Sequence, residues 1–140
     1  MKTVFAVDDN DTNLFVVEEA LSSEYSVYTM PSAEKMFLLL EKITPNLILL
    51  DIDMPVINGL TALKKLKSTK WAFIPVIFFS ASKNENYEVI GLELGAVDYI
   101  VKPFSTPILL SRIRKRINDF YLDDGSHYSE INKRYKGKQQ

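Results

Sequence analysis

Three carboxylates, a hydroxyl and an ammonium group stand at the ends of short apolar segments of this sequence. They belong to Asp8, Asp9, Asp51, Ser80 and Lys102. Clustered carboxylates repel one another unless a cation joins them, and oxygen ligands of this kind suit Mg²⁺. A hydroxyl and a lysine then supply a hydrogen-bond donor and a positive charge for the oxygens of a transferring phosphoryl group. If the fold brings the five residues together, they predict a phosphoryl-transfer site.

The segments that must position these residues alternate between short apolar runs and longer stretches with helical periodicity. The expected strands are 3–7, the less apolar 25–30, 47–50, 74–79 and 99–101. Strands that are apolar on both faces belong to a parallel sheet that helices cover on both sides. Ligands of such sheets bind outside the carboxyl ends of the strands. We therefore expect an α/β fold, a (βα)₅ chain with a doubly wound parallel sheet, and the five residues at one edge of it.

Helical periodicity follows each expected strand. The expected helices lie around 14–21, at 32–43, around 60–66, at 84–94 and at 106–120. Asp11 or Thr12 is the expected cap of the first helix. Thr106 is the expected cap of the fifth, with Pro107 at the first helical position. Gly95 is expected just past the fourth helix, in the left-handed conformation usual there.

Composition bounds the class of protein. The 140 residues are 46% hydrophobic and 25% charged, which suits one globular domain with its own core. The formal net charge of −1 gives no positive field, so we expect no direct binding to nucleic acid. Cysteine is absent, and no segment has the roughly 18 apolar residues of a membrane span. We expect a cytoplasmic protein without a membrane partner.

The last segment of the chain differs from the rest. From residue 122 to 140 the apolar periodicity is lost, and turn formers and charges take its place. We expect a domain over residues 1–121 and a C-terminal linker or tail over 122–140. A polar tail of this length favours a domain excised from a larger regulator over a stand-alone chain.

Four motifs resemble, in order and at suitable spacing, the signatures of receiver domains of two-component response regulators. They are Val-Asp-Asp-Asn at 7–10, Leu-Leu-Asp-Ile-Asp-Met-Pro at 49–55, Phe-Ser-Ala at 79–81, and Gly-Ala-Val-Asp-Tyr-Ile-Val-Lys-Pro-Phe at 95–104. The resemblance covers about residues 1–121. It implies a fold like that of the chemotaxis regulators, with the flavodoxin-like strand order 2-1-3-4-5.

The resemblance assigns an acceptor and a metal site. It implies that Asp51 accepts a phosphoryl group and also binds the metal ion. Asp8 and Asp9 then hold Mg²⁺, Asp9 more directly, and the backbone carbonyl of Asp53 completes the protein ligands. Mn²⁺ is the alternative ion. The acidic side chain of Asp53 stands where it can influence the lifetime of the phosphorylated state.

Ser80, Lys102 and Tyr99 receive roles from the same resemblance. Ser80, which replaces the more frequent threonine, and Lys102 contact the phosphoryl oxygens. Tyr99 occupies the position of the aromatic switch residue, which turns inward when the hydroxyl residue moves toward the phosphate. The Lys102–Pro103 peptide bond is commonly cis in the family, and proline is the residue that tolerates a cis bond.

The implied function is a phosphorylation-dependent signalling switch. Its expected partners are a sensor histidine kinase or a histidine phosphotransfer protein as donor, and an output domain or target protein as recipient of the signal. A phosphorylation-dependent homodimer through the fourth and fifth helices is a further expectation. The domain catalyses only its own phosphorylation and dephosphorylation, so no turnover of an external substrate is expected.

Two other functions compete with the switch. Asp51-Ile52-Asp53 also resembles the Asp-x-Asp pair of haloacid-dehalogenase-type phosphatases. In those enzymes the further acidic metal ligands follow the lysine, whereas here Asp8 and Asp9 precede it and nothing suitable follows Lys102. The second alternative is an interaction module of the same fold that works without phosphorylation.

Overall fold

A parallel sheet forms the middle layer of the computed structural model, which describes residues 1–81 and 84–120. Its five strands are β1 (Thr3–Val7), β2 (Ser26–Met30), β3 (Leu47–Asp51), β4 (Val76–Ser80) and β5 (Asp98–Val101). They lie in the order β2-β1-β3-β4-β5, and every neighbouring pair is parallel. The predicted order is confirmed. Because the strand order reverses between β1 and β3, a cleft for ligands is expected at their carboxyl ends.

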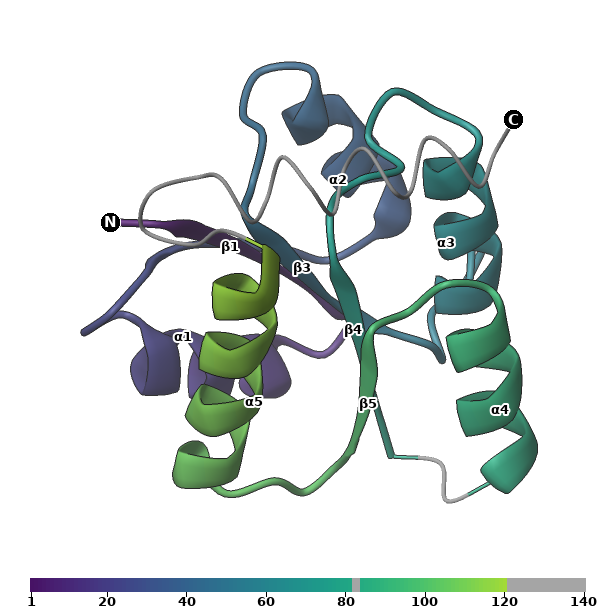
Figure 1. The fold of residues 1–140 in the computed structure, drawn as a ribbon. Helices are drawn as coiled ribbons and strands as arrows, with labels where there is room; N and C mark the ends of the chain where they lie inside the picture. Colours follow the sequence, from purple (N-terminus) through teal and green to yellow (C-terminus); the bar gives the residue numbers. More distant parts are fainter. Residues whose placement is uncertain (82–83, 121–140) are drawn as a thin grey trace.

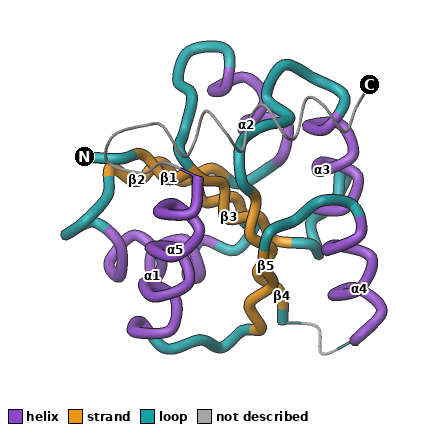
Figure 2. The backbone as a smooth tube through the Cα atoms, viewed as in Figure 1, coloured by secondary structure: helices purple, strands orange, loops and turns teal. Residues whose placement is uncertain are grey.

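Helices cover both faces of the sheet (Figure 1). They are α1 (Asp11–Leu21), α2 (Ala33–Leu40), α3 (Gly59–Lys67), α4 (Glu85–Glu93) and α5 (Thr106–Phe120). Helices α1 and α5 lie on one face, and α2, α3 and α4 lie on the other (Figure 1). Figure 2 shows the strands, in orange, running through the middle of the molecule between these helices.

Two apolar clusters hold the three layers together, one on each face of the sheet. Strand β3 contributes to both, because successive side chains of a strand point to opposite faces. Leu47 and Leu49 pack with α1 and α5, whereas Ile48 and Leu50 pack with α2 and α3. All four are fully buried. Strands β1, β3 and β4 are nearly continuous buried apolar runs, as predicted for a sheet covered on both sides, whereas the edge strand β2 is less apolar.

The predicted cap of α1, Asp11 or Thr12, was wrong by one or two residues. The side chain of Asn10, which precedes both Asp11 and Thr12, accepts a hydrogen bond from the backbone N–H of Asn13 at 3.0 Å. Asn10 has extended backbone angles, as an N-cap residue does, whereas Asp11 is already helical. Asparagine is as good a cap as aspartate, so composition alone did not separate the candidates.

The predicted cap of α5 was wrong in the same way. Ser105 accepts hydrogen bonds from Ile108 N at its side chain and from Leu109 N at its backbone carbonyl. Thr106 is therefore the first helical residue, and Pro107 is the second. Proline lacks an N–H group, and this causes no loss at either position, because the first turn has no partner for its N–H groups.

The remaining boundaries differ from the prediction by small amounts. Helix α2 ends at Leu40, earlier than the predicted 43. Gly95 has φ of 109°, which confirms the left-handed conformation expected past α4. The predicted linker or tail at 122–140 lies outside the described residues. Among residues 1–81 and 84–120, no helix has both the length and the apolar character that crossing a bilayer requires.

Candidate functional site

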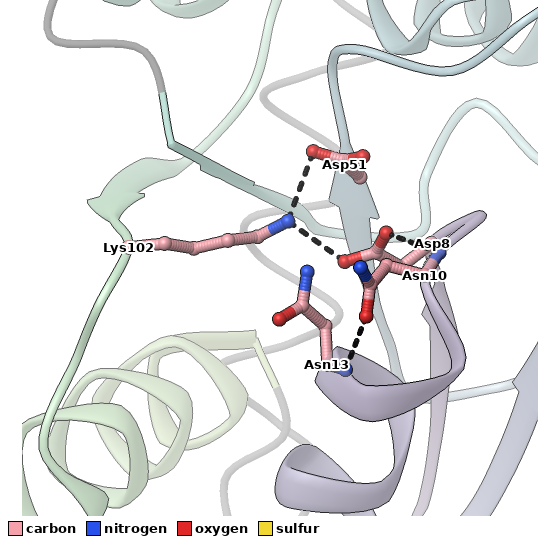
Figure 3. A network of polar contacts seen from close by, with 5 residues as sticks. All are labelled: Asp8, Asn10, Asn13, Asp51 and Lys102. Atoms are coloured by element: carbon pink, nitrogen blue, oxygen red, sulfur yellow. Dashed lines mark hydrogen bonds and ion pairs between the residues drawn. The ribbon is translucent and has the colours of Figure 1, made fainter.

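Lys102 joins two carboxylates that are far apart in the sequence. Its Nζ lies 2.7 Å from Oδ2 of Asp8 and 3.2 Å from Oδ1 of Asp51 (Figure 3). Both carboxylates are buried, with exposed fractions of 1% for Asp8 and 4% for Asp51. The carboxyl ends of β1 and β3 and the residue after β5 therefore meet at one edge of the sheet, as expected from the strand order.

The backbone around Lys102 directs its side chain toward this edge. The N–H of Lys102 donates to the carbonyl of Ser80 at 2.8 Å, which fixes the chain just past β5 to the end of β4. The Lys102 ammonium lies 4.4 Å from the centre of the Phe79 ring, so it also gains a cation–π contact. The Lys102–Pro103 peptide bond is cis, as the resemblance implied.

Three carboxylates at this edge could hold a metal ion. Asp8, Asp9 and Asp51 each offer an oxygen, and these oxygens lie within 4.8 Å of one another. Asp8 and Asp51 are buried, whereas Asp9 is exposed, so the cluster is open to water on one side. Hard oxygen ligands with room for water are the donor set that Mg²⁺ prefers. The residues present therefore fit a magnesium ion. Asp53 lies just beyond β3, and its side chain is exposed.

The environment of Asp51 disfavours its charged form when no cation is present. Burial is the largest cause, and together with the neighbouring charges it raises the pKa of Asp51 to about 6. The Lys102 ammonium acts in the opposite direction, while the carboxylates of Asp8 and Asp9 add to the rise. A cation bound to these carboxylates would offset both the burial and the repulsion.

Ser80 and Tyr99 lie next to each other on adjacent strands. Ser80 is fully buried at the end of β4, and Tyr99 on β5 is 6% exposed. Burial is the largest reason why the pKa of Tyr99 is raised, and the nearby Ser80 side chain acts in the opposite direction. The Tyr99 side chain is thus largely buried in this structure.

Sequence reasoning missed two asparagines at the rim of the site. The N–H of Asn10 donates to Oδ1 of Asp8 at 2.9 Å, and Asn10 also caps α1 through Asn13 N. The side-chain amide of Asn13 points toward the group formed by Asp8 and Lys102 (Figure 3). The cap joins the first turn of α1 to the acidic site. Asn10 directly after two aspartates was the signal that could have indicated this turn.

Gly59 is a further residue whose importance was not predicted. A Cβ at this position would lie 2.2 Å from the carbonyl oxygen of Asp51 and 2.8 Å from Cα of Ile52. The N–H of Gly59 donates to the carbonyl of Ile52 at 2.8 Å. The start of α3 therefore packs directly on the backbone that carries Asp51, and only glycine leaves room for this contact.

The loop between β3 and α3 contains a strained residue. Val56 has φ of 68° and is 91% exposed. A positive φ is a genuine outlier for a β-branched residue. Because Val56 has little packing to lose, Val56→Gly should raise the free energy of unfolding by about 0.5–1 kcal/mol. Urea unfolding of the variant and the wild type would measure this difference in the free energy of unfolding.

Val16→Gly is the control for this substitution. Val16 is also exposed but lies within α1, where glycine should lower stability by about 0.3–0.5 kcal/mol relative to valine. A loss of stability in Val56→Gly similar to that in the control would show that Val56 is not strained.

Comparison with known proteins identifies one family and several curated relatives. The sequence model of the family described as response regulator receiver domain matches residues 4–114. A probable cyclic di-GMP phosphodiesterase of Vibrio cholerae is 34% identical over 89% of this chain and 30% of its own length. The transcriptional regulatory protein CpxR of Klebsiella pneumoniae is 37% identical over 93% of this chain and 53% of its own length. The chain thus spans about half, or less, of these curated relatives.

A solved structure of similar fold carries a metal ion. It is the receiver domain of a sensor histidine kinase from Pseudomonas aeruginosa, described with a magnesium ion coordinated in its active site cleft. Its sequence is 25% identical, the TM-score is 0.76, and the match covers 84% of this chain and 98% of that one.

Proposed function

This chain belongs to the family of response regulator receiver domains, which are phosphoryl-accepting signalling switches, and we propose that Asp51 is its phosphoacceptor. The observation that carries this assignment is the contact of the Lys102 ammonium with both Asp8 and Asp51 at the carboxyl edge of the sheet. This contact brings together the carboxylate of Asp51 as nucleophile, the carboxylate of Asp8 as a cation ligand, and the positive charge of Lys102 for the transferred phosphoryl group.

Asp8, Asp9 and Asp51 would hold Mg²⁺, with Mn²⁺ as the alternative ion and the backbone carbonyl of Asp53 as a further ligand. Their mutual distances and the exposure of Asp9 support this assignment. When bound, the ion supplies positive charge that neutralises the oxygens of the transferring phosphoryl group.

Asp51 then acts as the nucleophile. One of its carboxylate oxygens forms the new O–P bond while the bond between phosphorus and the donor breaks. The donor is a phosphohistidine nitrogen in a partner protein, or an oxygen in a small acyl phosphate. With a pKa of about 6, most Asp51 carboxyls are already ionised at pH 7. Lys102 would contact the phosphoryl oxygens, and the Ser80 hydroxyl would donate to one of them.

The signal would pass through Ser80 and Tyr99. In this structure the Ser80 side chain is close enough to Tyr99 to lower the pKa of its hydroxyl, against the larger effect of burial. A phosphoryl group on Asp51 would compete for the Ser80 hydroxyl and so change the contacts of Tyr99. Tyr99 lines a groove together with Glu88, Val101 and Ile108, so its rearrangement would alter the surface between α4 and α5.

The remaining assignments concern the protein around this switch. The phosphodonor would be a sensor histidine kinase or a histidine phosphotransfer protein, and the recipient an output domain or target protein. We also propose a receiver unit over residues 1–121 with a linker or tail over 122–140, a cytoplasmic location, a homodimer on phosphorylation, and no turnover of an external substrate. The net charge of −1 supports a chain that does not itself bind nucleic acid.

The alternative functions have less support. The comparisons give no support to a haloacid-dehalogenase-type phosphatase, and the family match favours the receiver domain. An interaction module without phosphorylation would not need a partly buried lysine shared between two buried carboxylates.

Mass spectrometry tests the proposed function directly. Incubation with acetyl phosphate and Mg²⁺ should add one phosphoryl group to the intact protein, and a chelator should prevent this. Borohydride reduces an acyl phosphate to an alcohol, so digestion after reduction should show homoserine at position 51. Phosphoryl uptake that is equal with the chelator, or homoserine at another aspartate, would contradict the proposal.

A further inference from the structure

Strand β2 forms one edge of the sheet, and the backbone N–H and C=O groups of two of its residues point away from the sheet. Ser26 N–H donates to the carbonyl of Lys2, and the carbonyl of Met30 accepts from Asp8 N–H. The backbone groups of Ser26 and Met30 therefore point toward β1. In a parallel ladder, alternate residues direct their N–H and C=O groups to opposite sides of the strand. The peptide groups of Val27 and Thr29 therefore face outward. No strand in the part of the chain that the structure describes pairs with this edge.

An apolar groove lies beside this open edge. It has a volume of about 430 Å³ and runs between the end of β2 and the outer side of α2. Met30 and Leu39 form part of its wall. Leu38 also lines the groove, and its large apolar side chain is 70% exposed to water. A side chain placed in the groove would cover this apolar surface.

Two lysines give the groove a positive charge. Lys35 and Lys42 both line it, and no acidic residue does. Neither lysine forms an ion pair within residues 1–81 and 84–120, whereas the nearby Glu41 pairs with Lys70 at 3.8 Å. The complementary partner of this surface is therefore an acidic one.

We propose that an extended acidic segment of a partner protein binds here by adding a strand to the open edge of β2. Its backbone would pair with Val27 and Thr29, an apolar side chain would enter the groove against Leu38, and its carboxylates would meet Lys35 and Lys42. Backbone hydrogen bonds supply affinity in this mode of binding, and the groove supplies selectivity. This interaction is independent of phosphoryl transfer at Asp51.

A library of random dodecapeptides displayed on phage tests the proposal. Selection on the wild-type protein, with counter-selection on Leu38→Glu, should enrich peptides in which acidic and apolar residues alternate. An enriched peptide, synthesised and titrated by calorimetry, should bind at least tenfold more weakly to Leu38→Glu and to the double variant Lys35→Glu/Lys42→Glu. The double variant Lys64→Glu/Lys115→Glu has the same change in charge at exposed positions elsewhere and should bind as the wild type does.

Hydrogen exchange then tests the strand addition itself. The bound peptide should slow exchange of the Val27 and Thr29 amides. No enrichment, equal binding to all variants, or unchanged exchange at these two amides would overturn the proposal. So would a dimer in sedimentation that Leu38→Glu dissociates, because the occupant would then be a second copy of the chain. Leu38→Glu should take up a phosphoryl group like the wild type, which separates this test from that of the proposed function.

Discussion

Asp51→Asn is expected to abolish phosphoryl uptake and, in metal-free protein at pH 8, to raise the free energy of unfolding by about 2–3 kcal/mol. The loss of uptake follows because a carboxamide is not a nucleophile toward phosphorus. The gain in stability follows because the buried Asp51 carboxyl has a pKa of about 6 in the folded protein, above its ordinary value of 3.8. Asparagine has nearly the shape of a protonated aspartate and carries no charge.

The sign of the pH dependence follows from the same shift. An acid whose pKa is raised by folding contributes stability that is fully present below its unfolded pKa and is lost as the pH rises through the folded pKa. For Asp51 this window runs from 3.8 to about 6. The advantage of Asp51→Asn over the wild type should therefore be large at pH 8 and small at pH 4.

Urea unfolding in a chelator at both pH values would measure the effect, with mass spectrometry to follow uptake. Glu19→Gln removes an exposed carboxylate from α1 and should change stability little at either pH. Mg²⁺ should stabilise the wild type more than Asp51→Asn, because the ion binds a carboxylate that the variant lacks. A variant less stable than the wild type at pH 8 would show that ionised Asp51 is favourable without a metal ion.

The architecture could be predicted because parallel strands covered on both faces have a strong sequence signature. Leu47 to Leu50 point alternately into two cores, and a short run that is apolar at every position is typical of a strand buried on both sides. Once the strands are placed, their carboxyl ends must share an edge. The meeting of Asp8, Asp51 and Lys102 followed from this rule and from the order of strands implied by the resemblance.

Other features of the site depend on contacts that local patterns do not encode. Val56 is a residue that periodicity treats as an ordinary apolar loop position, yet its backbone is left-handed. Asn10 was overlooked because two other good caps follow it. The proximity of Ser80 to Tyr99 depends on the register of β4 against β5, which pairs Phe78 with Tyr99 and Ser80 with Val101.

Gly59 is the clearest case of such a contact, and Gly59→Ala should lower the free energy of unfolding by about 3 kcal/mol. Alanine favours helices by about 1 kcal/mol over glycine, so propensity alone predicts the opposite sign at this first residue of α3. The added Cβ, however, would lie 2.2 Å from the carbonyl oxygen of Asp51. A backbone atom in the buried β3 strand cannot move aside as a side chain can.

Asp51 should also be displaced when α3 or the end of β3 shifts to relieve this clash. We therefore expect the rate of phosphoryl uptake from acetyl phosphate to fall in Gly59→Ala, even at temperatures where the variant is folded. Thr61→Ala is the matched control, because it places an alanine at an exposed position two residues further along α3. This variant should leave stability and phosphoryl uptake nearly unchanged. A Gly59→Ala protein as stable as this control, with normal uptake, would mean that α3 can move away from Asp51 freely. The close contact between the two would then have no part in holding the acceptor in place.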